Sequence, residues 1–306
     1  MPALSRFLRY FMAVGHHGSI RRAADDLGIS PSAVDRQLLN AEAELGAPLF
    51  ERLPSGLRLT AAGEIMMAAG RRWQKELGDV RDQIADLQGL RRGHVQIAII
   101  DALARGAVPA MVSAIQARHP GIGIGISVLG NDSVRAAVAS GEADMGILLD
   151  PHSYRDLVVR AFVEVVLGVA TPPGHPLGGK RNVRFSACAG FPLIVPAHPL
   201  VISEQLAALE GATGLSPTRV ATCDHSQMIA SLVMQGAGLG ILTSIDVAPE
   251  VEEERLGFAR LSDPILRPLT LALCTASVRM PSHAAAMALG EIEAGFAQLG
   301  YDRDAA

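Results

Sequence analysis

The hydrophobic residues of the first 60 positions recur at spacings that predict three short helices. In the first helix, apolar side chains lie on one face at Leu4, Phe7, Leu8, Phe11 and Val14. Ser19 precedes a second helix, Ile20–Leu27, which ends at Gly28. Ser30 precedes a third helix, whose first residue is Pro31. Serine caps the free N–H groups of a helix start, and glycine favours a helix end. The second and third helices, joined by a short turn, therefore form a helix-turn-helix arrangement.

A β-hairpin and one long helix are predicted next. The apolar runs Leu49–Phe50 and Leu57–Leu59 flank the turn residues Pro54–Gly56, which is typical of a small hairpin, or wing. The long helix should begin after the cap residue Thr60 and continue to about Leu90. Its apolar residues alternate spacings of four and three, as in a coiled-coil seam, at Trp73, Leu77, Val80, Ile84 and Leu87. We expect this helix to pair two copies of the chain; the alternative is that it lies on its own domain.

From Arg91 onward, strand patterns alternate with helix patterns, which predicts βαβ units and a parallel sheet. The first run has strands at Val95–Ile100, Ile122–Leu129 and Met145–Leu149, and helices at Gly106–Arg118 and Ser133–Ser140. The second run has strands at Val163–Ala170, Leu193–Val195, Arg219–Cys223 and Gly240–Leu242, and helices at Ile202–Leu209 and Ser226–Gln235. A late strand and a late helix follow, at Leu269–Thr275 and His283–Leu299. We expect two α/β lobes, to the first of which this late segment returns.

The composition is that of an ordinary globular protein. The chain has 306 residues, of which 49% are hydrophobic and 19% charged, so two or three domains are expected. Its three cysteines, Cys188, Cys223 and Cys274, include no CxxC pair, which argues against a disulfide framework or a thiolate zinc site. The uncharged stretches Phe185–Ser203 and His225–Ile245 contain prolines, glycines or polar residues, so we expect no membrane span. Without a signal-peptide pattern, a reducing cytoplasm fits best.

Charge is divided unevenly between the two ends of the chain. Residues 1–93 hold 13 Lys and Arg against 11 Asp and Glu, a net charge of +2. The remainder holds 14 against 20, a net charge of −6. This division permits contact with nucleic acid at the N-terminal end only, although +2 is too weak a signal to establish it.

The N-terminal segment carries a specific combination of residues, at Gly18–Ser19, Ala23–Ala24, Leu27, Ser30, Ser32–Val34, Gln37, Glu42, Glu44–Gly46, Leu49–Arg52, Leu59–Thr60 and Ala62–Gly63. In this combination it closely resembles the winged helix-turn-helix of LysR-type transcriptional regulators. Two later stretches, PGHPL at Pro173–Leu177 and GAGLGIL at Gly236–Leu242, also fit that family. The resemblance implies an α/β protein with a winged helix-turn-helix at 1–62 and a linker (dimerisation) helix at 63–92. It also implies a two-lobed effector domain at 93–301, similar to periplasmic binding proteins, with lobe 1 at about 93–163 and 268–301 and lobe 2 at about 164–267.

The resemblance further implies the partners of such a regulator. It would bind double-stranded operator DNA in the cytoplasm as a dimer or tetramer, sense a small-molecule effector, and contact RNA polymerase if it is an activator. The candidates for DNA contact are Ser30, Ser32, Asp35, Arg36 and Gln37 on the third helix, and Arg52, Ser55 and Arg58 on the wing. Short polar groups and arginine can bond base edges in the major groove, and wing arginines suit the backbone phosphates. Asp35 stands where the family usually has serine, and Leu39, Asn40 and Ala41 also depart from its pattern.

Polar residues follow the predicted strands where an effector would bind between the lobes, because open α/β sheets bind ligands at strand ends. The candidates are Asp101, Ala102, Leu103, Arg105, Asn131, Asp132, Ser133, His198, Ile202, Asp224 and Ser226. Arg105 alone opposes the three acids Asp101, Asp132 and Asp224, so a neutral or cationic effector is favoured over an anionic one. The alternative is that each acid caps a helix.

The main alternative to a DNA-binding regulator is an enzyme. Asp224, His225 and Ser226, with His198, suggest a nucleophile and its base, but the chain has no GxSxG elbow. It also has no HExxH, GxxxxGK[ST] or GxGxxG motif. We therefore expect no catalysis, no cofactor and no metal. A two-lobed binding protein without a DNA role remains as the alternative function, and only residues 1–65 stand against it.

Overall fold

The computed structural model describes residues 6–54, 56–87, 93–151, 154–278, 280–296 and 299. The chain divides into two compact units, Met1–Leu90 and Arg91–Ala306, and each is described by itself. None of the described helices is both long and apolar enough to cross a membrane.

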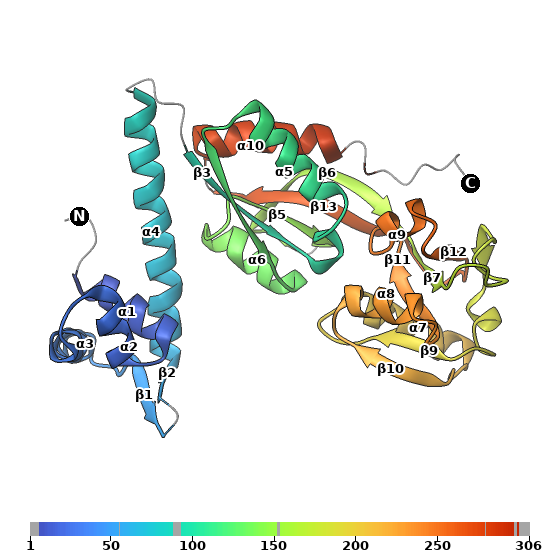
Figure 1. Ribbon diagram of the computed structural model, residues 1–306, viewed down its shortest axis with the longest axis horizontal. Helices are drawn as coiled ribbons and strands as arrows, with labels where there is room; N and C mark the ends of the chain where they lie inside the picture. Colours follow the sequence, from blue (N-terminus) through green and yellow to red (C-terminus); the bar gives the residue numbers. More distant parts are fainter. Residues whose placement is uncertain are drawn as a thin grey trace. The chain divides into compact units, whose positions relative to one another are not determined.

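The first unit is a winged helix-turn-helix followed by a long helix (Figure 1). Its elements are α1 (Arg6–His17), α2 (Ile20–Leu27), α3 (Pro31–Leu45), β1 (Phe50–Leu53), β2 (Gly56–Leu59) and α4 (Ala61–Leu87). Their boundaries follow from caps, because the side chains of Ser19 and Ser30 accept hydrogen bonds from N–H groups in the first turns of α2 and α3. Both helices end at glycines with positive φ, Gly28 and Gly46. A core that includes the fully buried side chains of Phe11, Val14 and Val34 holds the helices together.

A tight contact fixes where α4 leaves the wing. Thr60 caps α4 by accepting a hydrogen bond from the Gly63 N–H at 3.0 Å. A Cβ atom on Gly63 would collide with the Leu49 carbonyl oxygen, so a side chain does not fit at this position. The start of α4 is therefore held directly against the residue that precedes the wing.

The second unit contains two sheets, each with its own helices. The sheet of lobe 1 has the strand order β4 (Ile122–Val128), β3 (Gly93–Ile99), β5 (Met145–Leu149), β13 (Leu269–Ala276) and β6 (Leu157–Val165). Helices α5 (Ala107–Arg118) and α10 (His283–Phe296) pack together on one face, and α6 (Asn131–Ser140) lies on the other (Figure 1). The late strand β13 lies between β5 and β6, so the C-terminal segment does return to lobe 1.

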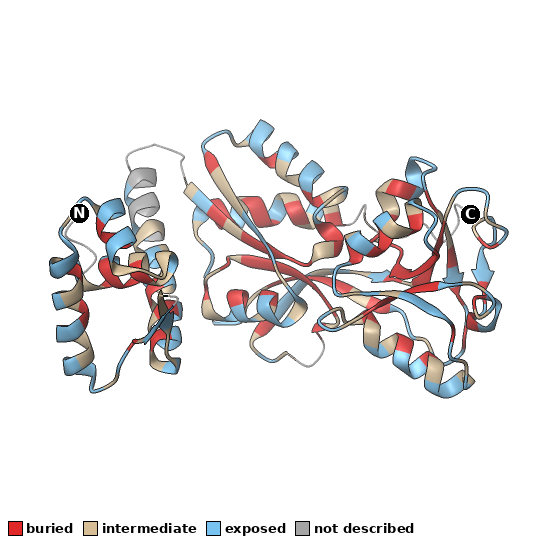
Figure 2. Ribbon diagram, turned by 60° about the horizontal axis from the view of Figure 1, so that its bottom comes forward, coloured by how far each residue is buried: buried red, intermediate tan, exposed pale blue. Residues whose placement is uncertain are grey.

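The sheet of lobe 2 has the strand order β10 (Arg219–Cys223), β9 (Leu193–Pro196), β11 (Leu239–Thr243), β7 (Leu167–Thr171), β12 (Gly257–Leu261) and β8 (Asn182–Val183). Its helices are α7 (Ile202–Thr213), α8 (Ser226–Met234) and the short α9 (Ala248–Glu252). Figure 2 shows buried residues concentrated on the strands of both sheets. The buried core is continuous across the two lobes.

Two expectations about this unit were wrong, and three elements were missed. The run Val163–Ala170 is not one strand: Val166 separates β6 from β7, and these strands belong to different sheets. Both sheets are mixed rather than parallel, because β13 is antiparallel to both its neighbours and β7 is antiparallel to β11 and β12. Helix α9 and strands β8 and β12 were not predicted. An apolar run that crosses from one buried sheet to another carries no polar break, so periodicity cannot divide it.

Candidate functional site

The exposed face of α3 carries the predicted base-contacting residues. Ser30 caps the helix by accepting from the Ala33 N–H at 3.3 Å, and its hydroxyl lies 3.2 Å from that of Ser32. Ser32 and Arg36 are exposed, and Gln37 is half-buried. Arg36 makes no hydrogen bond or ion pair with any described residue. Its guanidinium group is therefore available to a ligand.

The two wing arginines, in contrast, are already paired. Arg52 Nη2 donates to Asp35 Oδ1 at 3.0 Å, which joins the wing to α3, and Arg58 Nε donates to Glu51 Oε1 at 2.6 Å. The hydrogen bond between Arg58 and Glu51 lowers the pKa of the glutamate and raises that of the arginine. All four side chains are well exposed, so these pairs contribute little to stability and can open. Ser55, the remaining wing candidate, lies outside the described residues.

The predicted seam of α4 forms an apolar stripe on the first unit. Trp73, Val80 and Ile84 are 41%, 49% and 53% exposed, and Leu77 is half-buried. The Leu87 side chain lies outside the described residues. Among the described residues, the fold of the first unit therefore leaves much of this stripe exposed.

Asp101 and Ser226, which lie 125 positions apart, meet between the lobes. Asp101 begins the short 3-10 helix η1 (Asp101–Leu103) directly after β3 in lobe 1. Its Oδ2 atom accepts hydrogen bonds from Ser226 N at 2.9 Å, Ser226 Oγ at 2.8 Å and Gln227 N at 3.4 Å. His225 Nδ1 lies 3.0 Å from the same oxygen. The carboxylate thus caps a helix, as one alternative allowed, but the helix is α8 of the opposite lobe.

The other predicted effector residues have varied surroundings. Arg105 pairs with Glu250 of α9, whose side chain is fully buried, so its charge is already neutralised. The Asn131 side chain bonds both the N–H and the carbonyl of Leu149, and Asp132 accepts from the Tyr154 hydroxyl at 3.1 Å. Three candidates are buried apolar residues, namely Ala102, Leu103 and Ile202, and four are exposed, namely Asp132, Ser133, His198 and Asp224.

Neither Asp132 nor Asp224 caps its own helix. The cap positions of α6 and α8 are Gly130 and His225, and neither supplies a side-chain cap bond. The alternative in which these two acids act as helix caps is therefore wrong. Asp132 lies inside the first turn of α6 because this helix begins at Asn131, two residues before the expected start.

Two buried acids near Asp101 were missed by the sequence analysis. The Asp246 side chain accepts from Thr243 N at 2.7 Å and Thr243 Oγ1 at 2.6 Å. Burial raises the pKa of Asp246, and its hydrogen bonds with Thr243 and Ser226 oppose that rise. Glu250 pairs with Arg105 and lies 3.6 Å from Arg255. Asp246 follows a predicted strand by a few residues, and this position could have identified it. The ends of parallel strands lie at one edge of a sheet, where the other candidates were also sought.

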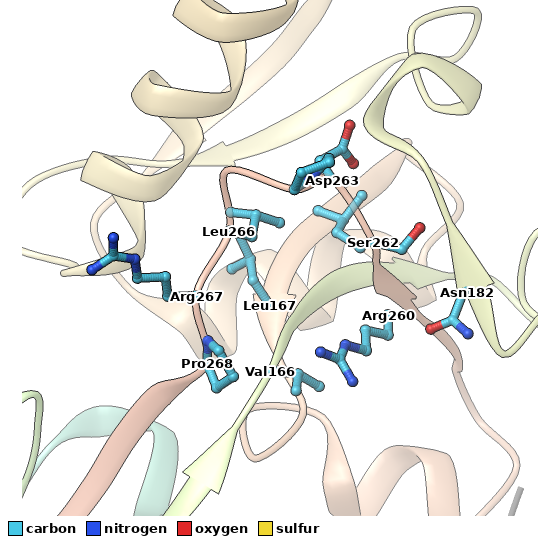
Figure 3. A pocket seen from close by; sticks show the side chains of 11 residues that line it. Val166, Leu167, Asn182, Arg260, Ser262, Asp263, Leu266, Arg267 and Pro268 are labelled. Carbon is cyan, nitrogen blue, oxygen red and sulfur yellow. The ribbon is translucent and has the colours of Figure 1, made fainter.

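A cavity of about 430 Å³ lies where the chain passes between the two sheets. Val166 contributes to it from one crossing segment, and Leu266 to Pro268 contribute from the other. Figure 3 shows the Arg260 and Asn182 side chains beside each other, with Arg267 on the far side of Pro268. None of these residues was a sequence candidate. Among the described residues, no cluster of three or more His, Cys, Asp or Glu side chains could hold a metal ion.

Comparisons with known proteins agree on one family. The sequence model described as "LysR substrate binding domain" matches residues 88–295, and that described as "Bacterial regulatory helix-turn-helix protein, lysR family" matches residues 5–64. The RuBisCO operon transcriptional regulator of Allochromatium vinosum is 28% identical over 251 residues, covering 82% of this chain and 83% of its own. The transcriptional activator CmpR of Synechocystis sp. is 25% identical over 240 residues, covering 78% and 79%. The structure of full-length CbnR complexed with target DNA aligns with a TM-score of 0.69 at 20% identity, covering 95% and 99%.

Proposed function

The chain belongs to the LysR family of bacterial transcriptional regulators, and on that premise we propose that α3 and the wing bind operator DNA while an effector binds between the two lobes. The observation that carries the DNA-binding part is the free, exposed guanidinium of Arg36 on a capped α3. Arginine in this position can bond a guanine edge in the major groove. The alternative of a binding protein without a DNA role loses its basis, because residues 5–64 match the family's helix-turn-helix.

The other proposed DNA contacts divide by role. Ser32 and Gln37 lie beside Arg36 on α3 and can bond base edges, whereas Ser30 is engaged in capping. Arg52 and Arg58 can contact DNA phosphates once their ion pairs with Asp35 and Glu51 open. Ser55 remains a candidate from sequence alone. Asp35 holds Arg52, so its role is to position the wing against α3.

The apolar stripe of α4 supports pairing of two copies. A helix with Trp73, Val80 and Ile84 exposed gains stability by burying them against the same stripe of a second chain. A dimer would present two copies of α3 to two half-sites, and dimers would pair further into tetramers. On this proposal the protein works in the cytoplasm, has no enzymatic role, and contacts RNA polymerase if it is an activator.

Arg36→Ala tests the DNA-binding proposal. An operator is first obtained by selecting bound sequences from random DNA, and affinities are then measured by gel shift. Arg36→Ala should weaken operator binding by about 1–3 kcal/mol because a base contact is lost. Arg58→Ala should weaken all sequences similarly and reduce the salt slope by about one unit. Arg155→Ala is the control, since it removes an exposed arginine from the second unit. Unchanged operator affinity in Arg36→Ala would contradict the assignment of Arg36.

A further inference from the structure

The hydrogen-bond acceptor for the first N–H groups of α8 lies in the other lobe. The first N–H groups of a helix have no partner within the helix and usually bond a side chain at the cap position. The cap residue of α8, His225, supplies no such bond. Asp101 supplies it instead, through one oxygen that receives the N–H groups of Ser226 and Gln227 and the Ser226 hydroxyl.

We propose that Asp101 is an internal ligand that occupies the N-terminus of α8, ties lobe 1 to lobe 2 and keeps anionic effectors out of this position. The inference rests on the proposed function, because it concerns the same space between the lobes. A helix N-terminus with free N–H groups binds carboxylates and phosphates. In this protein the Asp101 carboxylate occupies the N-terminus of α8, where such an anion would bind.

The surroundings of Asp101 strengthen the exclusion of anions. Burial raises the pKa of Asp246 in lobe 2, and the negative charge of Asp101 raises it further, so a second negative charge is already disfavoured at the start of α8. A carboxylate brought by an effector would meet the charge of Asp101 in a poorly solvated place, where such repulsion is strongest.

The one arginine beside this site does not relieve the repulsion. Arg105, four residues after Asp101, extends from lobe 1 to the buried Glu250 of α9 in lobe 2. This second cross-lobe pair neutralises the charge that an anionic effector would need. Asp101 and Arg105 thus each reach from lobe 1 to lobe 2: the Asp101 carboxylate accepts hydrogen bonds from α8, and Arg105 forms an ion pair with Glu250. Polar contacts that involve no ligand therefore join the lobes.

Asp101→Ala tests the proposal because it removes the carboxylate that occupies the N-terminus of α8. The full-length protein is examined by hydrogen exchange at the start of α8 and by melting temperature with sodium acetate, succinate or inorganic phosphate, each against sodium chloride at equal ionic strength. In the wild type we expect protected N–H groups at Ser226 and Gln227 and no rise in melting temperature with any of the three anions. In Asp101→Ala we expect faster exchange at those two groups and a rise of about 3 °C or more with at least one anion.

Asp156→Ala is the matched control. It removes an acid of the same lobe whose carboxylate pairs with Arg135 and not with α8, so neither exchange at α8 nor anion binding should change. Equal increases in anion binding by both variants would overturn the proposal, because general charge would then be the cause. Stabilisation of the wild type by succinate would overturn it without any variant, so the test stands even if Asp101→Ala folds poorly. Unchanged exchange at α8 in a folded Asp101→Ala would also overturn it.

A gel shift on the same preparations separates this inference from the proposed function. Asp101→Ala should retain operator affinity, because the proposed DNA contacts lie in the other compact unit. Loss of operator binding by every preparation, wild type included, would count against the proposed function. The anion results would still decide the role of Asp101.

Discussion

At the scale of single residues, the wing presents a competition between its own carboxylates and DNA phosphates. Arg58 is held by Glu51 across the hairpin, and Arg52 is held by Asp35. Each pair must open before the arginine can reach a phosphate. Because exposed ion pairs are weak, opening costs little, but each carboxylate that remains nearby still repels the DNA backbone. On the proposal that the wing contacts the DNA backbone, we therefore expect these carboxylates to reduce the affinity that the arginines would give alone.

Glu51→Gln should consequently strengthen DNA binding. The change frees Arg58 and removes a negative charge, so affinity for non-specific DNA should rise. The salt dependence should become steeper by about 0.9 unit for each additional phosphate that the protein neutralises. Titrations of random-sequence DNA at several salt concentrations measure both quantities. Glu204→Gln, an exposed acid of the second unit, serves as control and should have no effect. Weaker binding by Glu51→Gln would show that the pair orients Arg58 for DNA instead of competing with it.

The three cysteines differ in reactivity because they differ in burial. Burial raises the pKa of Cys188 to about 11 and that of Cys274 to about 12. Cys223 is half-buried, and its pKa is also raised, chiefly by burial. The thiolate is the form that reacts, so a higher pKa means less reactive thiol at a given pH.

Iodoacetamide at pH 8 should therefore modify Cys223 first in the native protein. Cys188 and Cys274 should react only after denaturation. Mass spectrometry of peptides after timed quenching gives the order. Early modification of Cys274 in native protein would contradict its placement in the core of lobe 1.

At the scale of elements, the apolar stripe of α4 leads to a prediction about assembly. Replacing both Leu77 and Ile84 by aspartate places charge in the proposed seam, where no opposite charge compensates it. The protein should then sediment as a monomer and lose operator affinity, because one chain reaches only one half-site. Ala68→Asp is the control, since Ala68 is exposed on the opposite side of the helix. A double variant that sediments like the wild type would show that the stripe does not pair chains.

The helices and strands that could be predicted are those with local signals. Ser19 and Gly28 mark the ends of α2, and the observed bounds match the expected ones. The crossing at Val166 could not be predicted, because no turn residue marks the point where the chain leaves one sheet for another. Helix α9 was missed because five residues are too few for a helical period to appear.

The candidate effector site was predictable only in part for a related reason. Strand ends indicated that Asp101 and Ser226 lie between the lobes, where the structure places them, and their contact with an effector stays a prediction. Their contact could not be foreseen, because it depends on how two sheets pack and joins positions 125 residues apart. The ion pair between Arg105 and Glu250 could not be predicted either, because Glu250 lies on α9, a helix that was not predicted.

At the scale of the whole molecule, charge sets what one copy can do on DNA. Residues 1–93 carry a net charge of only +2, and both wing arginines are paired with acids. Such a unit attracts DNA weakly. Joining copies through α4 would make the second contact intramolecular and raise overall affinity without a stronger single contact. The modest charge of the first unit therefore makes operator binding depend on assembly, and so on the integrity of α4.

The position of β13 between β5 and β6 also determines the order in which the lobes can be completed during synthesis. All of lobe 2 is translated after β6 and before β13, so β5 and β6 leave the ribosome without the strand that joins them. At about 5–20 residues per second, the roughly 100 intervening residues keep those strand edges unpaired for about 5–20 s. Unpaired edges invite association with other chains. A premature stop between β12 and β13 would therefore leave the strands of lobe 2 complete and lobe 1, which is begun first, without the strand that joins β5 to β6.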